Sequence, residues 1–166
     1  MEQVQIIDNF LPPKQLKFVQ EAIFHNNFSW KMPPPNSSCY ESGDFMYFNH
    51  FFFDHHVETC KLYSPMIVPI LEKLGSAAPI SVKSLIIFNK LFDKCIWHRD
   101  HQYEATTAIL YLNDCNGGTE LKVDDEIKFI QSKENRVVKF PSQTDHRACT
   151  STDSDLRYII NFNYFE

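Results

Sequence analysis

Three side chains that commonly bind transition metals stand in two short motifs of the C-terminal half. His98 and Asp100 are separated by one residue, and in a strand this spacing puts both on one face. His146 follows a segment expected to form a strand at 136–140. Two imidazoles and one carboxylate can bind a divalent metal on one side and leave positions open for reactants. Each motif also has an ordinary interpretation, because an isolated H-x-D or a loop histidine is common on protein surfaces.

The last predicted strand, at 156–165, carries a positive charge on one of its two faces. Arg157, Asn161 and Asn163 share a face, and aromatic and aliphatic side chains fill the other. If the apolar face packs on an outer layer, Arg157 points into the protein and needs an anion as partner. The alternative orientation leaves Arg157 in solvent.

A tyrosine in an earlier predicted strand is a candidate partner for the same anion. Tyr111 lies on one face of the strand at 106–112, together with Thr107 and Ile109. A tyrosine hydroxyl that faces inward needs a hydrogen-bond partner. Tyr111 and Arg157 could therefore meet at one carboxylate, whereas an ordinary tyrosine at the rim is the alternative.

The elements that must position these residues divide the chain into two parts. Apolar spacing predicts helices at about 13–26 and 58–74, and Val4–Ile7 is a short strand; residues 45–53 are a strand or a packed loop. Further strands are expected at 81–88, 106–112, 119–123, 126–130, 136–140 and 156–165. This order predicts a mainly β (α+β) fold, a sandwich or jelly roll. We expect one domain, 1–166, with N-terminal helical support at 1–78 and a jelly-roll core at 79–166.

Composition excludes several other classes of protein. The net charge is −5, which does not favour binding to nucleic acid. No apolar run is long enough for a membrane span, and Met1–Gln5 lacks the features of a signal peptide. The five cysteines show no C-x-x-C spacing, so reduced thiols and a cytoplasmic location are expected.

Taken in order, these motifs resemble the 2-oxoglutarate- and Fe(II)-dependent oxygenases, and within them the prolyl 4-hydroxylase-like branch. The resemblance covers about 80–166 and extends more loosely to the opening segment at 6–12. The motifs are His98-x-Asp100, Tyr111-Leu112-Asn113, Asn116-Gly117-Gly118-Thr119-Glu120-Leu121, Asn135-Arg136-Val137-Val138-Lys139-Phe140, His146 and Arg157-Tyr158.

The resemblance implies a fold, a chemistry and a role for each matched residue. The fold would be the double-stranded β-helix, a jelly roll. His98, Asp100 and His146 would bind Fe(II), and Arg157, Tyr111 and Asn161 would bind 2-oxoglutarate. With O2 as the second cosubstrate, and ascorbate as an optional reductant, oxidative decarboxylation of 2-oxoglutarate would be coupled to hydroxylation of a substrate.

Two positions depart from the pattern of the resembling family. Phe88 stands where many relatives have a tyrosine near the cosubstrate, with Asn89 beside it as a possible substitute. Asn163 stands where the family has an inward-facing aromatic residue. Both changes bear on the inner contacts of the cosubstrate and on the substrate class.

The substrate class stays open at the level of sequence. The resemblance favours a prolyl residue in a peptide or protein, and a free amino acid or small metabolite is the alternative. Arg99 and Arg147, beside two predicted ligands, are candidate substrate contacts, as are the loops at 31–57 and 99–105. A cupin-like metal-binding jelly roll without 2-oxoglutarate chemistry, and a non-enzymatic jelly roll, are the competing classes.

The other histidines have ordinary interpretations. His101 is predicted to face away from His98 and Asp100 as an exposed loop residue. His50, His55 and His56 could indicate a second metal site, but no cysteine or carboxylate pattern surrounds them. Packing between the helices and the sandwich is the expected role of the aromatic clusters at 45–48 and 51–53.

Overall fold

Two antiparallel sheets face each other in the computed structural model, which describes residues 4–33, 47–89 and 94–166. The larger sheet has the strand order β1 (Gln5–Ile7), β8 (Arg136–Pro141), β5 (Thr106–Tyr111), β10 (Leu156–Phe165), β4 (Ala78–Phe88), β2 (Tyr47–Asp54) and β3 (Val57–Glu58). The smaller sheet has the order β7 (Glu126–Gln131), β6 (Gly118–Val123) and β9 (His146–Cys149). The predicted mainly β jelly-roll class is confirmed.

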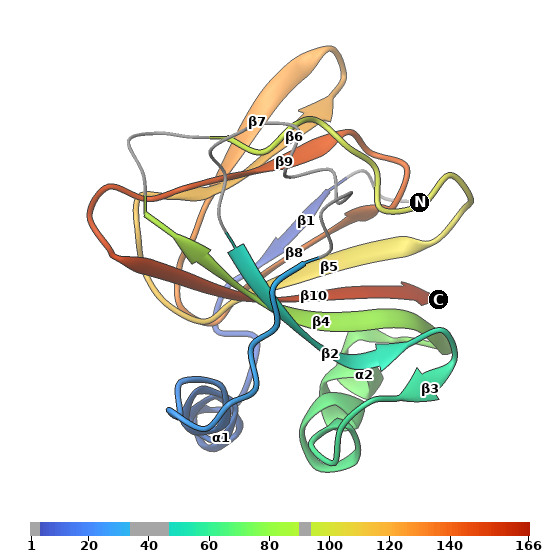
Figure 1. Cartoon of the computed structure of the whole chain (residues 1–166). Coiled ribbons are helices and arrows are strands. Elements are labelled where there is room, and N and C mark those ends of the chain that lie inside the picture. Colours follow the sequence, from blue (N-terminus) through green and yellow to red (C-terminus); the bar gives the residue numbers. More distant parts are fainter. Residues whose placement is uncertain (1–3, 34–46, 90–93) are drawn as a thin grey trace.

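The helices cover the face of the larger sheet that is turned away from the smaller one (Figure 1). Helix α1 (Pro13–Ile23) buries Leu16, Val19 and Ile23, as its apolar spacing predicts, and ends three residues before the expected boundary. The second predicted helix is shorter than expected. A π-helical turn at Tyr63–Ile67 contains Pro65 and leads into α2 (Val68–Leu74), where Pro69 sits in the first turn and needs no helical N–H partner.

Alternation along the central strands produces two separate apolar cores. On β10, Ile160, Phe162 and Tyr164 pack with the helices. Ile159, one residue away, packs between the sheets with Leu121 of β6. Arg157, Asn161 and Asn163 therefore point into the space between the sheets, which is the inward orientation that the sequence left open.

Strands from the N-terminal part of the chain complete the larger sheet. β1 pairs with β8, and β2 pairs with β4, so the aromatic segment at 47–54 is a strand rather than a packed loop. The sequence interpretation did not anticipate β3 or β9. β9 pairs with β6 and places His146 at the edge of the smaller sheet. No helix among the described residues is long and apolar enough to cross a membrane.

Candidate active site

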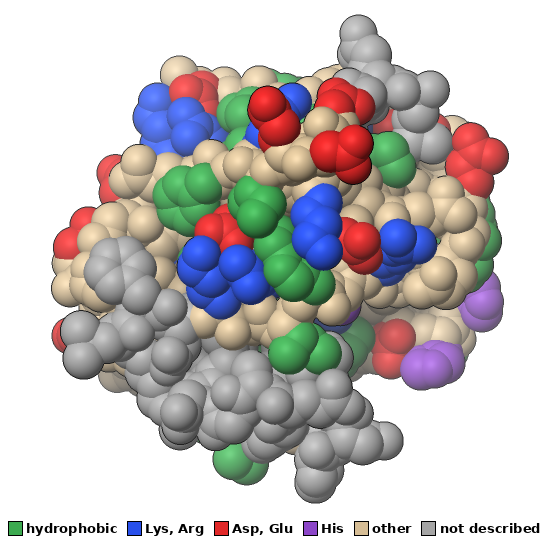
Figure 2. Space-filling view, turned by 90° about the horizontal axis from the view of Figure 1, so that it is seen from above, with side chains coloured by type: hydrophobic (Ala, Val, Ile, Leu, Met, Phe, Trp, Pro, Cys, Tyr) green, Lys and Arg blue, Asp and Glu red, His purple; other side chains and the backbone are tan. Residues whose placement is uncertain are grey.

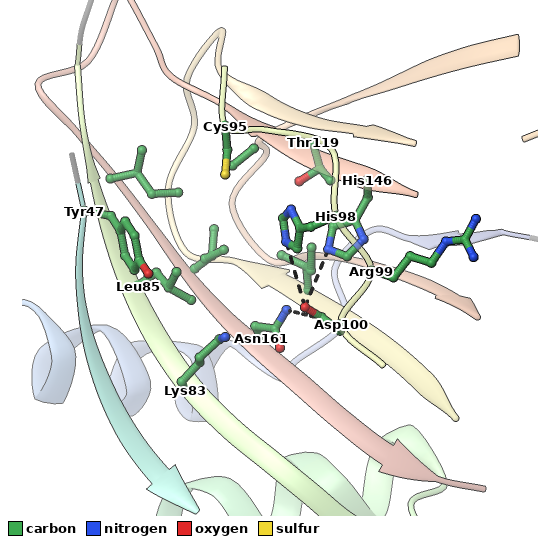
Figure 3. Close-up of a pocket in the computed structure, with 14 residues that line it drawn as sticks. Tyr47, Lys83, Leu85, Cys95, His98, Arg99, Asp100, Thr119, His146 and Asn161 are labelled. Carbon is green, nitrogen blue, oxygen red and sulfur yellow. Dashed lines mark hydrogen bonds and ion pairs between the residues drawn. The ribbon is translucent and has the colours of Figure 1, made fainter. Parts of the chain in front are cut away.

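Three predicted metal ligands come together between the two sheets (Figure 3). One nitrogen or oxygen atom from each of His98, Asp100 and His146 lies within 4.8 Å of the other two. Across the site, His98 N donates to His146 O at 3.0 Å and His146 N donates to His98 O at 2.9 Å. This single bridge replaces the strand expected around His98, because the backbone from His98 to Asp100 is otherwise irregular.

Backbone carbonyls fix the orientation of both imidazole rings. Nδ1 of His98 lies 3.1 Å from Ile96 O, and Nδ1 of His146 lies 3.0 Å from Thr144 O. Since a carbonyl only accepts, each Nδ1 carries a proton, and in the neutral ring this leaves Nε2 as the atom that can bind a metal. These Nε2 atoms lie 4.0 Å (His98) and 3.8 Å (His146) from Oδ1 of Asp100. Support of this kind from surrounding groups is typical of histidines that bind metals.

The carboxylate of Asp100 is held in its charged form. Its Oδ2 accepts from Asn161 Nδ2 at 3.1 Å and lies 3.3 Å from Thr107 Oγ1. Burial acts to raise the pKa of Asp100, but attraction to His146, Lys83 and His98 outweighs it and keeps that pKa well below its usual range. Burial and repulsion from His146 lower the pKa of His98, which favours the neutral ring that a metal requires.

Arg157 lies fully buried between the sheets without a carboxylate partner among the described residues. Its Nη1 donates to Cys149 O and its Nη2 to Thr119 Oγ1, both at 3.2 Å, while Nε has no hydrogen-bond partner in the described part of the chain. A buried guanidinium with these neutral partners is costly unless an anion reaches it.

Tyr111 and Arg157 lie close together, as the sequence suggested, and both donate a hydrogen bond to Thr119. The guanidinium carbon lies 5.3 Å from the centre of the Tyr111 ring, and Tyr111 Oη donates to Thr119 Oγ1 at 2.9 Å. Burial raises the pKa of Tyr111, so its hydroxyl stays protonated. Thr119 therefore joins the buried cation to the wall of the cavity beside the three metal-binding side chains.

A cavity of about 270 Å³ contains the three side chains and extends to Thr119. Its walls also include the predicted residues Arg99 and Asn161, whereas Arg157 and Tyr111 lie behind Thr119 and Arg147 lies outside. The complete wall is formed by Tyr47, Lys83, Leu85, Ile87, Cys95, His98, Arg99, Asp100, Ile109, Thr119, His146, Ala148, Ile159 and Asn161.

The two arginines predicted at the mouth of the site both have acidic partners. Arg99 Nε donates to Asp145 Oδ1 at 2.9 Å, and Arg147 Nε donates to Glu120 Oε2 at 2.7 Å. Arg147 also lies over the Trp97 ring at 4.2 Å. Each arginine thus already has a carboxylate partner, and Glu120 is also bound by Lys94 Nζ at 2.6 Å.

The other flagged positions lie around the cavity without entering it. Phe88 packs edge-on against Phe48 at 5.5 Å, and Asn89 donates to Asp155 at 3.0 Å. His101 is half-buried rather than exposed, because it stacks on Tyr103. In the described ranges, no second group of three or more histidine, cysteine or acidic side chains converges as His98, Asp100 and His146 do.

Among the residues of the wall that the sequence interpretation missed are Thr119, Lys83 and Tyr47. Thr119 stands in the quoted Gly117-Gly118-Thr119 motif, but its role depends on a contact between β6 and β10. Lys83 shares a face of β4 with Leu85 and Ile87, and this two-residue spacing was the available signal that its side chain points inward. Tyr47 faces the cavity from β2, opposite Ile87.

The residues present fit the metal and cosubstrate that the sequence resemblance implies. Two imidazoles and one carboxylate suit Fe(II) and leave coordination positions for reactants. The buried guanidinium, with an unpaired Nε among the described residues, suits the carboxylate of 2-oxoglutarate.

A family model matches the part of the chain that carries this donor set. The family model described as the 2OG-Fe(II) oxygenase superfamily matches residues 86–165, a span that contains His98, Asp100, His146 and Arg157. No curated protein sequence matches the chain.

Solved structures share the fold at low sequence identity. A Pseudomonas putida prolyl-4-hydroxylase is 12% identical, with a TM-score of 0.63 over 98% of this chain and 92% of the other. A Trichoplax adhaerens prolyl hydroxylase, in complex with a hypoxia inducible factor peptide fragment, is 16% identical, with a TM-score of 0.64 over 99% and 84%. A 2OG-Fe(II) oxygenase family oxidoreductase from Burkholderia pseudomallei is 8% identical, with a TM-score of 0.73 over 97% and 84%.

Residues 86–165 therefore match the 2OG-Fe(II) oxygenase superfamily, and the resemblance seen in the sequence is confirmed over this span. Prolyl hydroxylases are among the solved structures that share the fold of this chain.

Proposed function

We propose that this protein is a hydroxylase in which His98, Asp100 and His146 bind Fe(II). The observation that carries the proposal is the approach of the Nε2 atoms of His98 and His146 to Oδ1 of Asp100, in a cavity that extends to Thr119, the hydrogen-bond partner of the buried Arg157. When bound, iron and 2-oxoglutarate supply the oxidising chemistry that couples decarboxylation to hydroxylation of a C–H bond.

In this scheme the protein's own residues bind the cosubstrate, orient a metal ligand and limit the access of water to the cavity. Thr119, Arg157 and Tyr111 provide the anchor for the far carboxylate of 2-oxoglutarate, which gives the guanidinium the anion that it lacks among the described residues. Asn161, which the resemblance assigns to 2-oxoglutarate, donates a hydrogen bond to Asp100 and so orients this metal ligand. Leu85, Ile87, Ile109 and Ile159 make one side of the cavity apolar and limit the access of water.

The proposed substrate is a prolyl residue in a peptide or protein. The support is the fold shared with two prolyl hydroxylases, one of them solved with a peptide fragment. A screen of proline-containing peptides against free amino acids, read out as a mass increase of one oxygen atom, tests this substrate class. If only free amino acids are hydroxylated, the substrate is a small molecule and not a peptide. Ascorbate is included in the screen as a reductant.

Anaerobic addition of Fe(II) and 2-oxoglutarate tests the centre itself. We expect a visible charge-transfer band in the wild type, its loss in His146→Ala and its weakening in Arg157→Lys. His25→Ala removes an exposed histidine outside the cavity and is the matched control. If the wild type shows neither the band nor slow formation of succinate in air, the proposal is wrong, and a cupin-like metal site without 2-oxoglutarate becomes the better interpretation.

A further inference from the structure

Lys83 projects from β4 into the same cavity as the metal-binding cluster (Figure 3). It lies on the face of β4 that carries Leu85 and Ile87, and it is paired in register with Asn161 of β10. Its side chain is half-buried. A lysine on this inner face is unusual, because the next two positions along the same face, Leu85 and Ile87, are apolar.

The ammonium group of Lys83 has no ion-pair partner among the described residues. Its nearest described aromatic contact is the Phe51 ring, whose centre lies 5.9 Å from Nζ. The carboxylate of Asp100 is attracted to the ammonium group, but it already accepts a hydrogen bond from Asn161 and faces His98 and His146. A partly buried cation without its own counter-ion stabilises an anion that enters the cavity.

Lys83 and Arg157 start from separate positions along the paired strands. On the paired strands, Arg157 lies opposite Ile87 and Asn161 lies opposite Lys83. Four residues along a strand correspond to about 13 Å. Figure 3 shows Lys83 on the other side of the cluster from Thr119, through which Arg157 reaches the cavity wall. The cluster therefore lies between two separate cationic positions.

A second cavity, of about 450 Å³, begins at Lys83. It shares Lys83 and Asp100 with the first cavity. Its other walls include the aromatic residues Phe51, Tyr103 and Phe165. A molecule that occupied this second cavity would thus present its nearest group to both the ammonium of Lys83 and the metal-binding cluster.

We propose that Lys83 binds a carboxylate of the substrate and so selects acidic substrates. This inference rests on the proposed hydroxylase function, in which Arg157 is already taken by 2-oxoglutarate. The carboxylate can come from two sources, the α-carboxylate of a free amino acid or an acidic side chain close to the target residue in a peptide. Arg99 and Arg147 are poorer candidates for this role, because each already has a carboxylate partner, Asp145 and Glu120 respectively.

Matched acid and amide probes test the inference by calorimetry on protein loaded anaerobically with Fe(II) and 2-oxoglutarate. One pair is L-proline and L-prolinamide; the other is a capped peptide with glutamate or glutamine beside proline. We expect at least one acid to bind about tenfold or more tightly than its amide, as for a hydrogen bond to a charged group. The pair that shows the preference identifies the source of the carboxylate.

Variants of Lys83 assign the preference to this side chain. Lys83→Met should bring the acid and amide affinities to within about twofold, while Lys83→Arg, which keeps the charge, should retain most of the preference. Lys128→Met, which removes an exposed lysine on β7, should leave the preference intact.

Three results would overturn the inference while leaving the hydroxylase proposal standing. These are no acid preference in the wild type, a full preference in Lys83→Met, or a loss of 2-oxoglutarate affinity in Lys83→Met as large as in Arg157→Lys. The last result would make Lys83 a cosubstrate contact. Absence of both the charge-transfer band and slow succinate formation in the wild type overturns the hydroxylase proposal, and this inference with it.

Discussion

Asn161 donates a hydrogen bond from Nδ2 to Oδ2 of Asp100 at 3.1 Å, and thereby leaves Oδ1 toward the two imidazoles. Asn161 is itself held, because its Oδ1 accepts from Asn163 Nδ2 at 2.8 Å. Asn163 Oδ1 in turn accepts from Thr107 Oγ1 at 2.7 Å, and this hydroxyl lies 3.3 Å from Asp100. The polar ring explains Asn163, which departs from the family pattern: it supports a metal-binding carboxylate from behind.

Replacement of Asn161 tests this support. Asn161→Ala should lower the affinity for Fe(II) about 10- to 100-fold, since loss of a group that orients a ligand typically has an effect of this size. Anaerobic titration with Fe(II), followed by the charge-transfer band with 2-oxoglutarate, measures the change. Asn26→Ala, at an exposed position, is the control. An unchanged affinity would show that Asp100 is oriented without Asn161.

Thr119 is the acceptor for two buried donors, so its loss should cost more than the loss of either donor. Thr119→Val keeps the shape but leaves Tyr111 Oη and Arg157 Nη2 without this partner, which should lower the free energy of unfolding by about 1–3 kcal/mol. Tyr111→Phe removes one donor and leaves Thr119 bonded to Arg157, so about 1 kcal/mol is expected. Urea denaturation compares the two variants. Equal losses would contradict the shared-acceptor arrangement.

The close approach of β6 and β7 leaves no room for a side chain at Gly118. A Cβ there would overlap the carbonyl oxygen of Ile130 and come within 2.8 Å of the Phe129 ring. Gly118→Ala should lower the free energy of unfolding by about 1–3 kcal/mol and weaken 2-oxoglutarate binding, because Thr119 would shift with the strand. Thermal unfolding and the charge-transfer titration measure both effects.

Gly75 is the control position for the prediction on Gly118. A Cβ at Gly75 meets no atom within 4 Å, but its φ of 81° is unfavourable for alanine. Gly75→Ala should therefore lower the stability by about 1 kcal/mol and leave 2-oxoglutarate binding unchanged, since α2 lies on the far side of the larger sheet. Loss of binding in both variants would point to general destabilisation rather than to Thr119.

The parts of this site that depend on local pattern could be predicted from the sequence. The face shared by Arg157, Asn161 and Asn163 follows from alternation, and the structure has it as predicted. Thr119 and Lys83 could not be assigned in this way, because their roles come from which strands meet across the cavity. The same holds for Arg99 and Arg147, whose acidic partners Asp145 and Glu120 become neighbours only in the folded protein.

A surface ion-pair cluster joins the turn after β1 to the start of β8 and should make stability depend on pH. Asp8 bonds Arg136 Nε at 2.6 Å and Lys133 Nζ at 2.9 Å. Hydrogen bonds from Arg136 and Lys133 hold the pKa of Asp8 well below its usual range. A carboxyl group whose pKa is lower in the folded state stabilises the fold above its unfolded pKa of about 3.9. That contribution is lost as the pH falls toward the folded value.

Asp8→Asn removes the charge while keeping the shape, so it should lower the melting temperature by a few degrees at pH 6. The difference from the wild type should shrink below about pH 4, where the unfolded carboxyl group becomes protonated. Calorimetric melting between pH 3 and pH 7 measures this convergence. Glu126→Gln, at an exposed position of β7, is the control and should give no such convergence. A constant offset for Asp8→Asn at every pH would mean that Asp8 acts through its shape or hydrogen bonds alone, since only a titrating charge makes the two melting curves meet.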